Sequence, residues 1–508
     1  MTAEQTDPQH DRRWAILAVL CLTVFLVVVD NTIVNVALVT FSRELGATTS
    51  QLQWIVDAYS LVFAGLLLAA GSLGDRRGRK GTMQVGLVLF ATTSVLAAFS
   101  TTATQLIAAR AAMGIGAALI FPATLAILTS VFTEPTERAK AIGAWSGVTG
   151  LAVALGPLAG GFLLEHFWWG SIFLVNIPIA LLALVAGRLL IPDSRDPRPG
   201  GLDRMGLFLS ITAVAAIVWA VIEAPHRGWT SPEIVIIGTT GLLLLAAFVV
   251  HELRTSYPLL DVSLFANPRF SAASVAIASA FFGLFGFIFL ITQYMQLVQG
   301  YSPLQAGLRT VPFAVVTGVF SPLSIAIMHR VGSKAVVAFG LALMSTGFVM
   351  ASTLEADSAY FGPVLASMVV MAAGLGLTTS PATEAIMGAL PADKAGVGSA
   401  VNDTTRELGG TLGVAIVGSV FASLYGPQIV DGLNGFPEQV VALAEESMGA
   451  AVVLSEQLPQ GAVLLEAARS AFMSGFQAGS LVAAGATAVG AVLALLWLPA
   501  RHRVTPTT

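Results

Sequence analysis

Long apolar runs separated by short polar segments dominate this chain. A helix needs about twenty apolar residues to cross the hydrocarbon core of a bilayer, which is roughly 30 Å thick. Windows of that width place fourteen candidate spans at 14–38, 51–73, 82–100, 104–131, 139–163, 168–190, 205–224, 233–250, 270–297, 304–328, 334–354, 360–380, 396–424 and 472–498. The runs are continuous and lack the alternation typical of barrel strands. The pattern therefore predicts an all-α integral membrane protein.

The composition agrees with a membrane protein and disfavours several other classes. Of the 508 residues, 56% are hydrophobic and only 11% are charged, which is too few charges for a water-soluble surface of this size. The formal net charge of -4 shows no basic excess, so we expect no nucleic-acid partner. The single cysteine, Cys21, leaves no intramolecular disulfide and no cysteine-based metal cluster. Because we also find no ATP-binding G-x-x-x-x-G-K segment, we expect a transporter without cofactors, driven by an ion gradient, rather than an enzyme.

Lysine and arginine residues are distributed unevenly between alternate loops. If the N-terminus is cytoplasmic, the loop residues of this kind fall almost entirely on the cytoplasmic side, and only Arg43, Arg227 and Arg469 lie in outer loops. Cytoplasmic loops of membrane proteins are enriched in these residues. We therefore predict a multi-pass protein of a bacterial cytoplasmic membrane, with both termini in the cytoplasm.

A short Gly-Lys-Gly pattern occurs twice with an offset of 254 residues, at Gly78, Lys80 and Gly86 and again at Gly332, Lys334 and Gly340. Two six-helix halves with a helix pair between them give this offset. We predict one bundle at 1–190, a linker with the inserted pair at 191–261, and a second bundle at 262–508 with a long outer loop at 425–471. Repeated bundles around a midplane site are a transporter architecture.

Six segments resemble signatures of the major facilitator superfamily. GSLGDRRGRKG (71–81) resembles its loop between helices two and three, RAAMGIGAA (110–118) its fourth helix, and GVTGLAVALGPLAGG (147–161) the fifth helix of its antiporters. Three further segments resemble the fourteen-spanning drug:proton antiporter branch, namely VVDNTIVNVAL (28–38), FLVNIP (173–178) and AGVGSAVNDTTRELGGTLG (395–413). Two positions depart from this branch: Val39 stands where Pro is usual, and Glu407 where Gln is usual.

The resemblance implies the major facilitator fold and proton-driven export of small amphipathic drugs or metabolites by a functional monomer in the lipid bilayer. Export of an endogenous lipid or a siderophore-like metabolite is an alternative that the same cavity would support. A membrane sensor or scaffold without transport is a more remote alternative, and it would not need ionisable residues inside the membrane.

Three charged residues fall at a similar depth in the first bundle, Asp30, Asp57 and Arg110, as the helical rise of about 1.5 Å per residue indicates. Ionisable side chains inside a membrane are costly, so each is a functional candidate. We interpret Asp30 as the principal proton carrier, Asp57 as its assistant or as a contact for cationic substrate, and Arg110 as the group that tunes both acids. The alternative is a static ion pair that holds helices together.

A second charged group lies near the inner end of the thirteenth span. Asp403 and Glu407 are four residues apart and share one helix face, with Arg406 between them. We interpret them as a second proton or cation site or as part of an inner gate. The alternative is a set of solvent-facing side chains that neutralise one another.

The 71–81 segment combines charges with turn-forming glycines. The resemblance implies a latch that contacts the opposite bundle on the cytoplasmic side, formed by Gly71, Gly74, Asp75, Arg76, Gly78, Arg79 and Lys80. The alternative is that the basic residues only set the topology, which leaves Asp75 and the glycine spacing unexplained.

The fifth span carries small residues and one proline, with Gly147, Gly156, Pro157, Gly160 and Gly161 as the antiporter helix motif. The spacing by itself predicts close helix packing, whereas a bend that favours exchange follows only from the resemblance. Aromatic residues of the ninth span, such as Phe281 and Phe285, either line a substrate cavity or face lipid, so the substrate-binding residues stay open. The acidic 425–471 loop either covers the outer vestibule or is a surface excursion.

Overall fold

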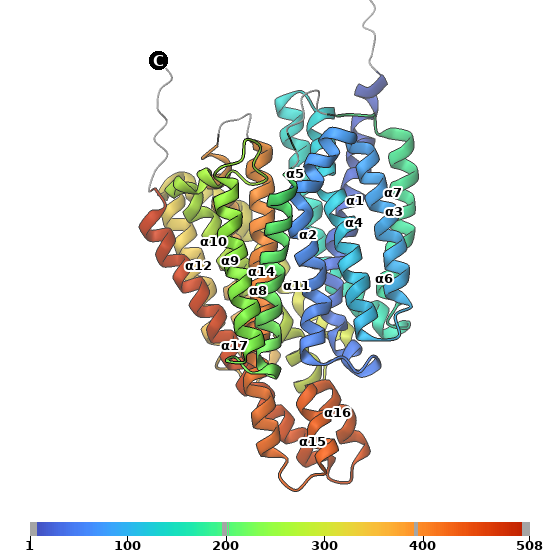
Figure 1. Ribbon diagram of the computed structural model, residues 1–508, viewed down its shortest axis with the longest axis vertical. Helices are drawn as coiled ribbons and strands as arrows, with labels where there is room; N and C mark the ends of the chain where they lie inside the picture. The colour runs from blue at the N-terminus through green and yellow to red at the C-terminus, as the bar shows by residue number, and fades with distance from the viewer. Residues whose placement is uncertain (1–7, 196–200, 202, 391–394, 500–508) are drawn as a thin grey trace, which may run out of the picture.

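The computed structural model describes residues 8–195, 201, 203–390 and 395–499, and within these ranges the chain is helical without strands (Figure 1). The first group comprises α1 (Pro8–Glu44), α2 (Thr49–Arg77), α3 (Arg79–Ala98), α4 (Ala103–Val131), α5 (Pro135–His166), α6 (Ser171–Leu174) and α7 (Asn176–Leu190). A helix pair follows, α8 (Arg204–Arg227) and α9 (Pro232–Glu252). The last group comprises η1 (Val262–Ala266), α10 (Pro268–Gln293), η2 (Tyr294–Val298), α11 (Pro303–Val331), α12 (Ser333–Ala351), η3 (Tyr360–Val364), α13 (Leu365–Met387), α14 (Ala395–Gly432), α15 (Glu438–Glu446), α16 (Met448–Gln457) and α17 (Gly461–Trp497).

Fourteen helices in the described ranges are long and apolar enough to cross a membrane, which confirms the predicted fold class. Predicted and observed bounds agree closely for spans such as 104–131, which is α4, and 205–224, which is α8. Large apolar side chains are exposed on the outside of the bundle, as with Leu189 and Leu243. These surfaces suit lipid rather than water.

The Gly-Lys-Gly repeat has the same structure in both groups of helices. Gly78 ends α2 and Gly332 ends α11, both at positive φ, 113° and 89°, which a residue without Cβ adopts easily. Gly86 and Gly340 each allow close packing on a neighbouring helix. A Cβ on Gly86 would lie 2.9 Å from the Gly116 carbonyl oxygen of α4, and a Cβ on Gly340 would lie 2.8 Å from the Gly374 carbonyl oxygen of α13. The division of the chain at 190 and 261 stays a prediction.

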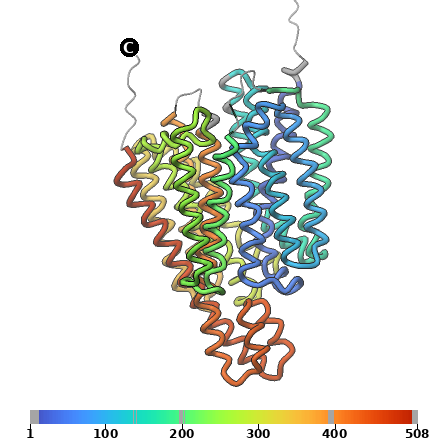
Figure 2. The backbone as a smooth tube through the Cα atoms, viewed as in Figure 1, coloured from blue at the N-terminus to red at the C-terminus, as the bar shows by residue number. Residues whose placement is uncertain are grey.

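The bundle has two distinct ends (Figures 1 and 2). We call the end where α1 begins and α17 ends the terminal end, and the end that carries α15 and α16 the hairpin end. Most of the predicted 425–471 loop is helical. The chain leaves the bundle as a continuation of α14, forms α15 and α16, and returns as α17, which begins at Gly461.

The contacts that join the first and last groups of helices concentrate toward the hairpin end. Helix α5 packs there against α11, where a Cβ on Gly161 would lie 2.6 Å from Leu304 Cα. Gln53 of α2 donates from Nε2 to the carbonyl oxygens of Val414 and Ala415 in α14, at 3.2 and 3.0 Å. This end of the bundle is therefore closed in the structure.

Candidate functional site

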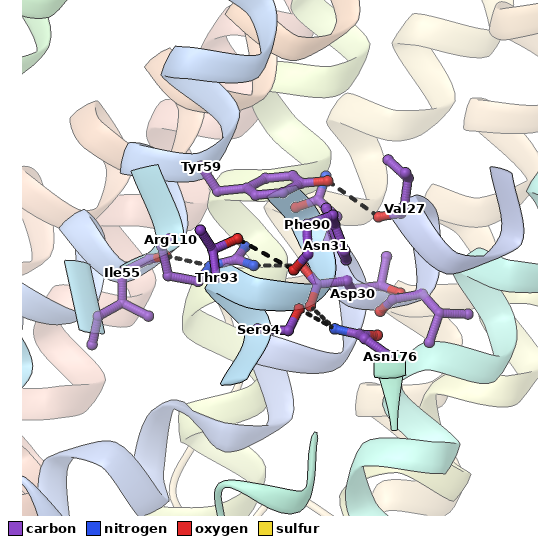
Figure 3. Close-up of polar contacts among 12 residues, drawn as sticks. Val27, Asp30, Asn31, Ile55, Tyr59, Phe90, Thr93, Ser94, Arg110 and Asn176 are labelled. Atoms are coloured by element: carbon purple, nitrogen blue, oxygen red, sulfur yellow. Dashed lines mark hydrogen bonds and ion pairs between the residues drawn. The ribbon is translucent and has the colours of Figure 1, made fainter. Parts of the chain in front are cut away.

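Asp30 of α1 and Arg110 of α4 form an ion pair inside the first group of helices (Figure 3). Arg110 Nη1 lies 2.5 Å from Asp30 Oδ2, and both side chains have 0% exposure. A pair of charges removed from water needs close geometry and further hydrogen bonds to be tolerated. The sequence prediction placed these two residues in one pocket, and the structure brings them into contact.

Helix α2 holds the Arg110 guanidinium from a second side. Arg110 Nε donates to the Ile55 carbonyl oxygen at 3.1 Å, and its Cζ lies 4.2 Å from the centre of the Tyr59 ring. Gly114, one turn further along α4, makes this approach possible, because a Cβ there would lie 2.6 Å from the Tyr59 carbonyl oxygen. The Arg-and-Gly pattern of 110–118 thus positions the charge by letting two backbones pack closely.

Asp57 is equally buried but is not part of this pair. Its side chain has 0% exposure, and neither carboxylate oxygen has a hydrogen-bond partner among the described residues. Asp57 lies one turn from Gln53 on α2, on the face that meets α14. The two residues of similar depth in the sequence therefore occupy different faces of the first group of helices, Asp30 inside it and Asp57 toward the last group.

Asp403, Arg406 and Glu407 lie on α14 and are partly buried. Asn402 Nδ2 donates to Asp403 Oδ1 at 3.5 Å, and Arg406 Cζ lies 5.0 Å from the centre of the Phe281 ring in α10. These three side chains are therefore not on a freely solvated outer surface.

The charged residues of the 71–81 segment contact their own group of helices. Arg79 Nε donates to Asp75 Oδ1 at 2.8 Å, and its Nη1 donates to the Ala126 carbonyl oxygen at 3.3 Å. Lys80 Nζ donates to the Arg188 carbonyl oxygen at 3.0 Å. Arg76 is exposed, and Gly71 and Gly74 pack against Pro122 and Thr82. These contacts lie within the first group of helices, and the latch, which is expected in the outward-open state, stays a prediction.

The glycines of α5 join it to two other helices. A Cβ on Gly156 would lie 1.9 Å from Thr32 Oγ1 of α1, and one on Gly160 would lie 2.6 Å from Ile33 Cγ1. The Pro157 carbonyl oxygen would lie 2.4 Å from a Cβ on Gly307 of α11. Gly147 by contrast has open space around it. Helix α5 thus connects α1, which carries Asp30, to α11 at the closed hairpin end.

A family model matches residues 20–414 of this chain, and its description is the Major Facilitator Superfamily. The chain belongs to the major facilitator superfamily. It is therefore a membrane transporter that acts on small substrates in a lipid bilayer, and it is not an enzyme.

Curated members of the superfamily match over nearly the whole length. The multidrug efflux pump LfrA of Mycolicibacterium smegmatis is 39% identical over 93% of this chain and 94% of its own length. The methyl viologen resistance protein SmvA of Salmonella typhimurium is 37% identical over 91% of this chain and 93% of its own. A solved bacterial homologue of the human lysosomal transporter Spinster matches the fold with a TM-score of 0.69 and 16% identity, over 96% of this chain and 97% of its own.

Sequence reasoning missed one partner of this facilitator's buried Asp30 carboxylate, Asn176. Asn176 Nδ2 donates to Asp30 Oδ1 at 2.7 Å and lies 3.3 Å from Ser94 Oγ of α3 (Figure 3). The signal was present in FLVNIP, where an amide stands in an apolar run two residues before Pro178 and α6 gives way to α7. A neutral amide is a weaker signal of function than a charge, because the free-energy cost of placing an amide inside a membrane is lower.

Proposed function

We propose that this facilitator exports small amphipathic compounds in exchange for protons, and that Asp30 is the principal proton carrier. The observation that carries the proposal is the buried Asp30–Arg110 ion pair between two helices long enough to span a bilayer. Charges at such a position are costly and are typical of proton relays and substrate pathways. The names of LfrA and SmvA support drug-like compounds as the cargo.

Protonation of Asp30 removes the negative partner of Arg110. A buried guanidinium without its counter-charge is strongly unfavourable, so α1 and α4 have to adjust their packing when the proton arrives. The adjustment passes to α5, because Gly156 and Gly160 hold α5 against α1 close to Asp30. Helix α5 in turn closes the hairpin end against α11. Proton binding to Asp30 is thereby coupled to opening of the hairpin end.

We propose that Asp57 meets cationic substrate or a second proton, and that Asp403 and Glu407 form the corresponding acidic site of the last group. The buried Asp57 carboxylate has no hydrogen-bond partner among the described residues and lies one turn from Gln53, which contacts α14, so it is available to a ligand between the two groups. Asp57→Asn should therefore impair export of cationic compounds more than export of neutral ones.

We propose that both termini lie in the cytoplasm of a bacterial cell, so that the structure is closed toward the outside. The uneven distribution of Lys and Arg supports this orientation. A membrane-impermeant thiol reagent should label a cysteine at Glu438, in α15, on intact cells, and should not label one at Thr505. Labelling of position 505 from outside would overturn the orientation.

Reconstitution of the purified protein in proteoliposomes tests the transport mode. An imposed pH gradient should drive a cationic or amphipathic test compound against its concentration gradient, and collapse of the pH gradient by an ionophore should abolish accumulation. Accumulation that persists without the gradient would contradict proton coupling.

A further inference from the structure

Asn176 occupies an unusual position at the start of α7, where the sixth span is interrupted. Its side chain is 1% exposed, and Ser94 is 0% exposed. The amide nitrogen contacts both Asp30 Oδ1 and Ser94 Oγ, whereas the amide oxygen is buried without a hydrogen-bond partner in the described ranges. Buried acceptors without a partner are uncommon and often mark a functional group.

The present hydrogen bonds suit an ionised Asp30. Arg110 donates to Oδ2 and Asn176 donates to Oδ1, so each carboxylate oxygen accepts from a donor. An ionised carboxylate only accepts hydrogen bonds, whereas a protonated one carries an O–H donor that needs an acceptor. A proton on Asp30 Oδ1 would therefore point at the Asn176 amino group, so two hydrogen-bond donors would face each other.

Among the described partners of Asp30, Asn176 alone offers an acceptor in its side chain. Arg110 has donors only. Tyr59, which lies over the guanidinium, directs its hydroxyl to the Val27 carbonyl oxygen at 3.3 Å. Rotation of the Asn176 amide by half a turn exchanges its nitrogen and oxygen, and the Ser94 hydroxyl can reverse from acceptor to donor at the same time. The rotation breaks no hydrogen bond of the amide oxygen within the part of the chain that the structure describes, because that oxygen has no partner there.

We propose that Asn176 is a positioning residue that follows the protonation state of Asp30, donating to the carboxylate when it is ionised and accepting from the carboxyl O–H when it is protonated. This inference rests on the proposed role of Asp30 as proton carrier. The amide offers Asp30 a hydrogen-bond partner in both states, so the Asp30 carboxyl group exchanges its proton without losing its contact with Asn176.

Infrared difference spectroscopy of the protein in lipid, between acidic and alkaline pH, tests the inference directly. The carboxylic C=O band of protonated Asp30 is identified by its absence from Asp30→Asn. In Asn176→Leu this band should move to higher frequency, because the O–H loses its acceptor. The band should stay in place in Asn35→Leu, a control at a buried asparagine whose amide donates only to carbonyl oxygens of its own helix, those of Asn31 and Thr32.

Wild-type protein with isotope-labelled asparagine gives a second measurement that does not depend on folding of a variant. A labelled amide band should change together with the Asp30 band as the pH is changed. Gradient-driven transport by Asn176→Leu should fall about tenfold, since a hydrogen bond to a charged group is lost, while substrate exchange without a gradient continues.

The outcomes separate this inference from the proposed function. An unshifted Asp30 band in Asn176→Leu, or a labelled amide band that ignores pH, overturns the role of Asn176 even if Asp30→Asn abolishes proton-driven transport. Proton-driven transport by Asp30→Asn overturns the proposed function itself.

Discussion

The hydroxyl oxygens of Ser42 and Ser447 lie 2.9 Å apart, although 405 residues separate them in the chain. Ser42 lies in the last turn of α1 at the hairpin end, and Ser447 lies between α15 and α16. Thr49 Oγ1 donates nearby to the Glu446 carbonyl oxygen at 3.1 Å. The α15–α16 hairpin thus connects the first group of helices to the last group across the closed end.

A disulfide at this contact should lock the transporter. In a Cys21→Ser background, the pair Ser42→Cys and Ser447→Cys should form a disulfide on oxidation, because the two native hydroxyl oxygens are 2.9 Å apart. Oxidation should stop transport, and a reductant should restore it, because the hairpin end can no longer open. Each single cysteine serves as the control. Full transport by the cross-linked protein would show that this contact does not have to separate.

The α5 glycines should differ sharply in their tolerance of larger side chains. Gly156→Val should lower the free energy of unfolding by about 1–3 kcal/mol, because its Cβ would overlap Thr32 Oγ1. Gly147→Val is the matched control, since nothing lies within 4 Å of a Cβ at that site. Thermal unfolding in detergent measures both variants. Equal stability of the two would contradict the packing of α5 against α1.

Asp75 tests whether the 71–81 segment does more than set topology. Asp75→Asn removes a charge that the topology rule does not require, and it removes the ion pair with Arg79. Membrane insertion should be unchanged, and transport should fall sharply. Glu466→Gln, at an exposed carboxylate of α17, is the control. Transport at the wild-type rate by Asp75→Asn would leave the segment as a topology signal only.

Asp203 should give the protein a stability that depends on pH. It caps α8 by accepting from the Gly206 amide at 2.8 Å, and it contacts His251 Nε2 of α9 at 2.8 Å. Burial acts to raise the pKa of Asp203, but the hydrogen bonds from Gly206 and His251 outweigh burial and hold the pKa below its usual value. A carboxylate with a lowered pKa stabilises the fold above the ordinary aspartate range and loses that effect as the pH falls.

Thermal unfolding of wild-type protein and Asp203→Asn across acidic pH measures this effect. The wild type should be more stable by about 1 kcal/mol near neutral pH, and the difference should shrink as the pH falls below the ordinary aspartate range. A constant difference at all pH values would show that the charge of Asp203 is not responsible.

Hydropathy and charge spacing were sufficient for the helices, because each span is defined by its own composition. They also suggested the meeting of Asp30 with Arg110. Hydropathy and charge spacing did not separate Asp57 from that pair, because the depth of a residue along its helix does not determine which neighbouring helix its side chain faces. The 425–471 segment was predicted as a loop because its acidic residues lower the mean hydropathy, although the same residues allow helices in water. Asn176 was missed because its partners come from α1 and α3, which only the fold brings together.

Gradient-driven transport by Asp30→Asn in proteoliposomes tests the central claim most directly. Asparagine keeps the shape of the side chain and a hydrogen bond to its neighbours, but it cannot bind and release a proton. The protein should fold and insert normally and should lose accumulation driven by a pH gradient, and Arg110→Ala should lose it as well because the acid then has no counter-charge. Accumulation by Asp30→Asn at the wild-type rate would contradict the account and would direct attention to Asp403 and Glu407.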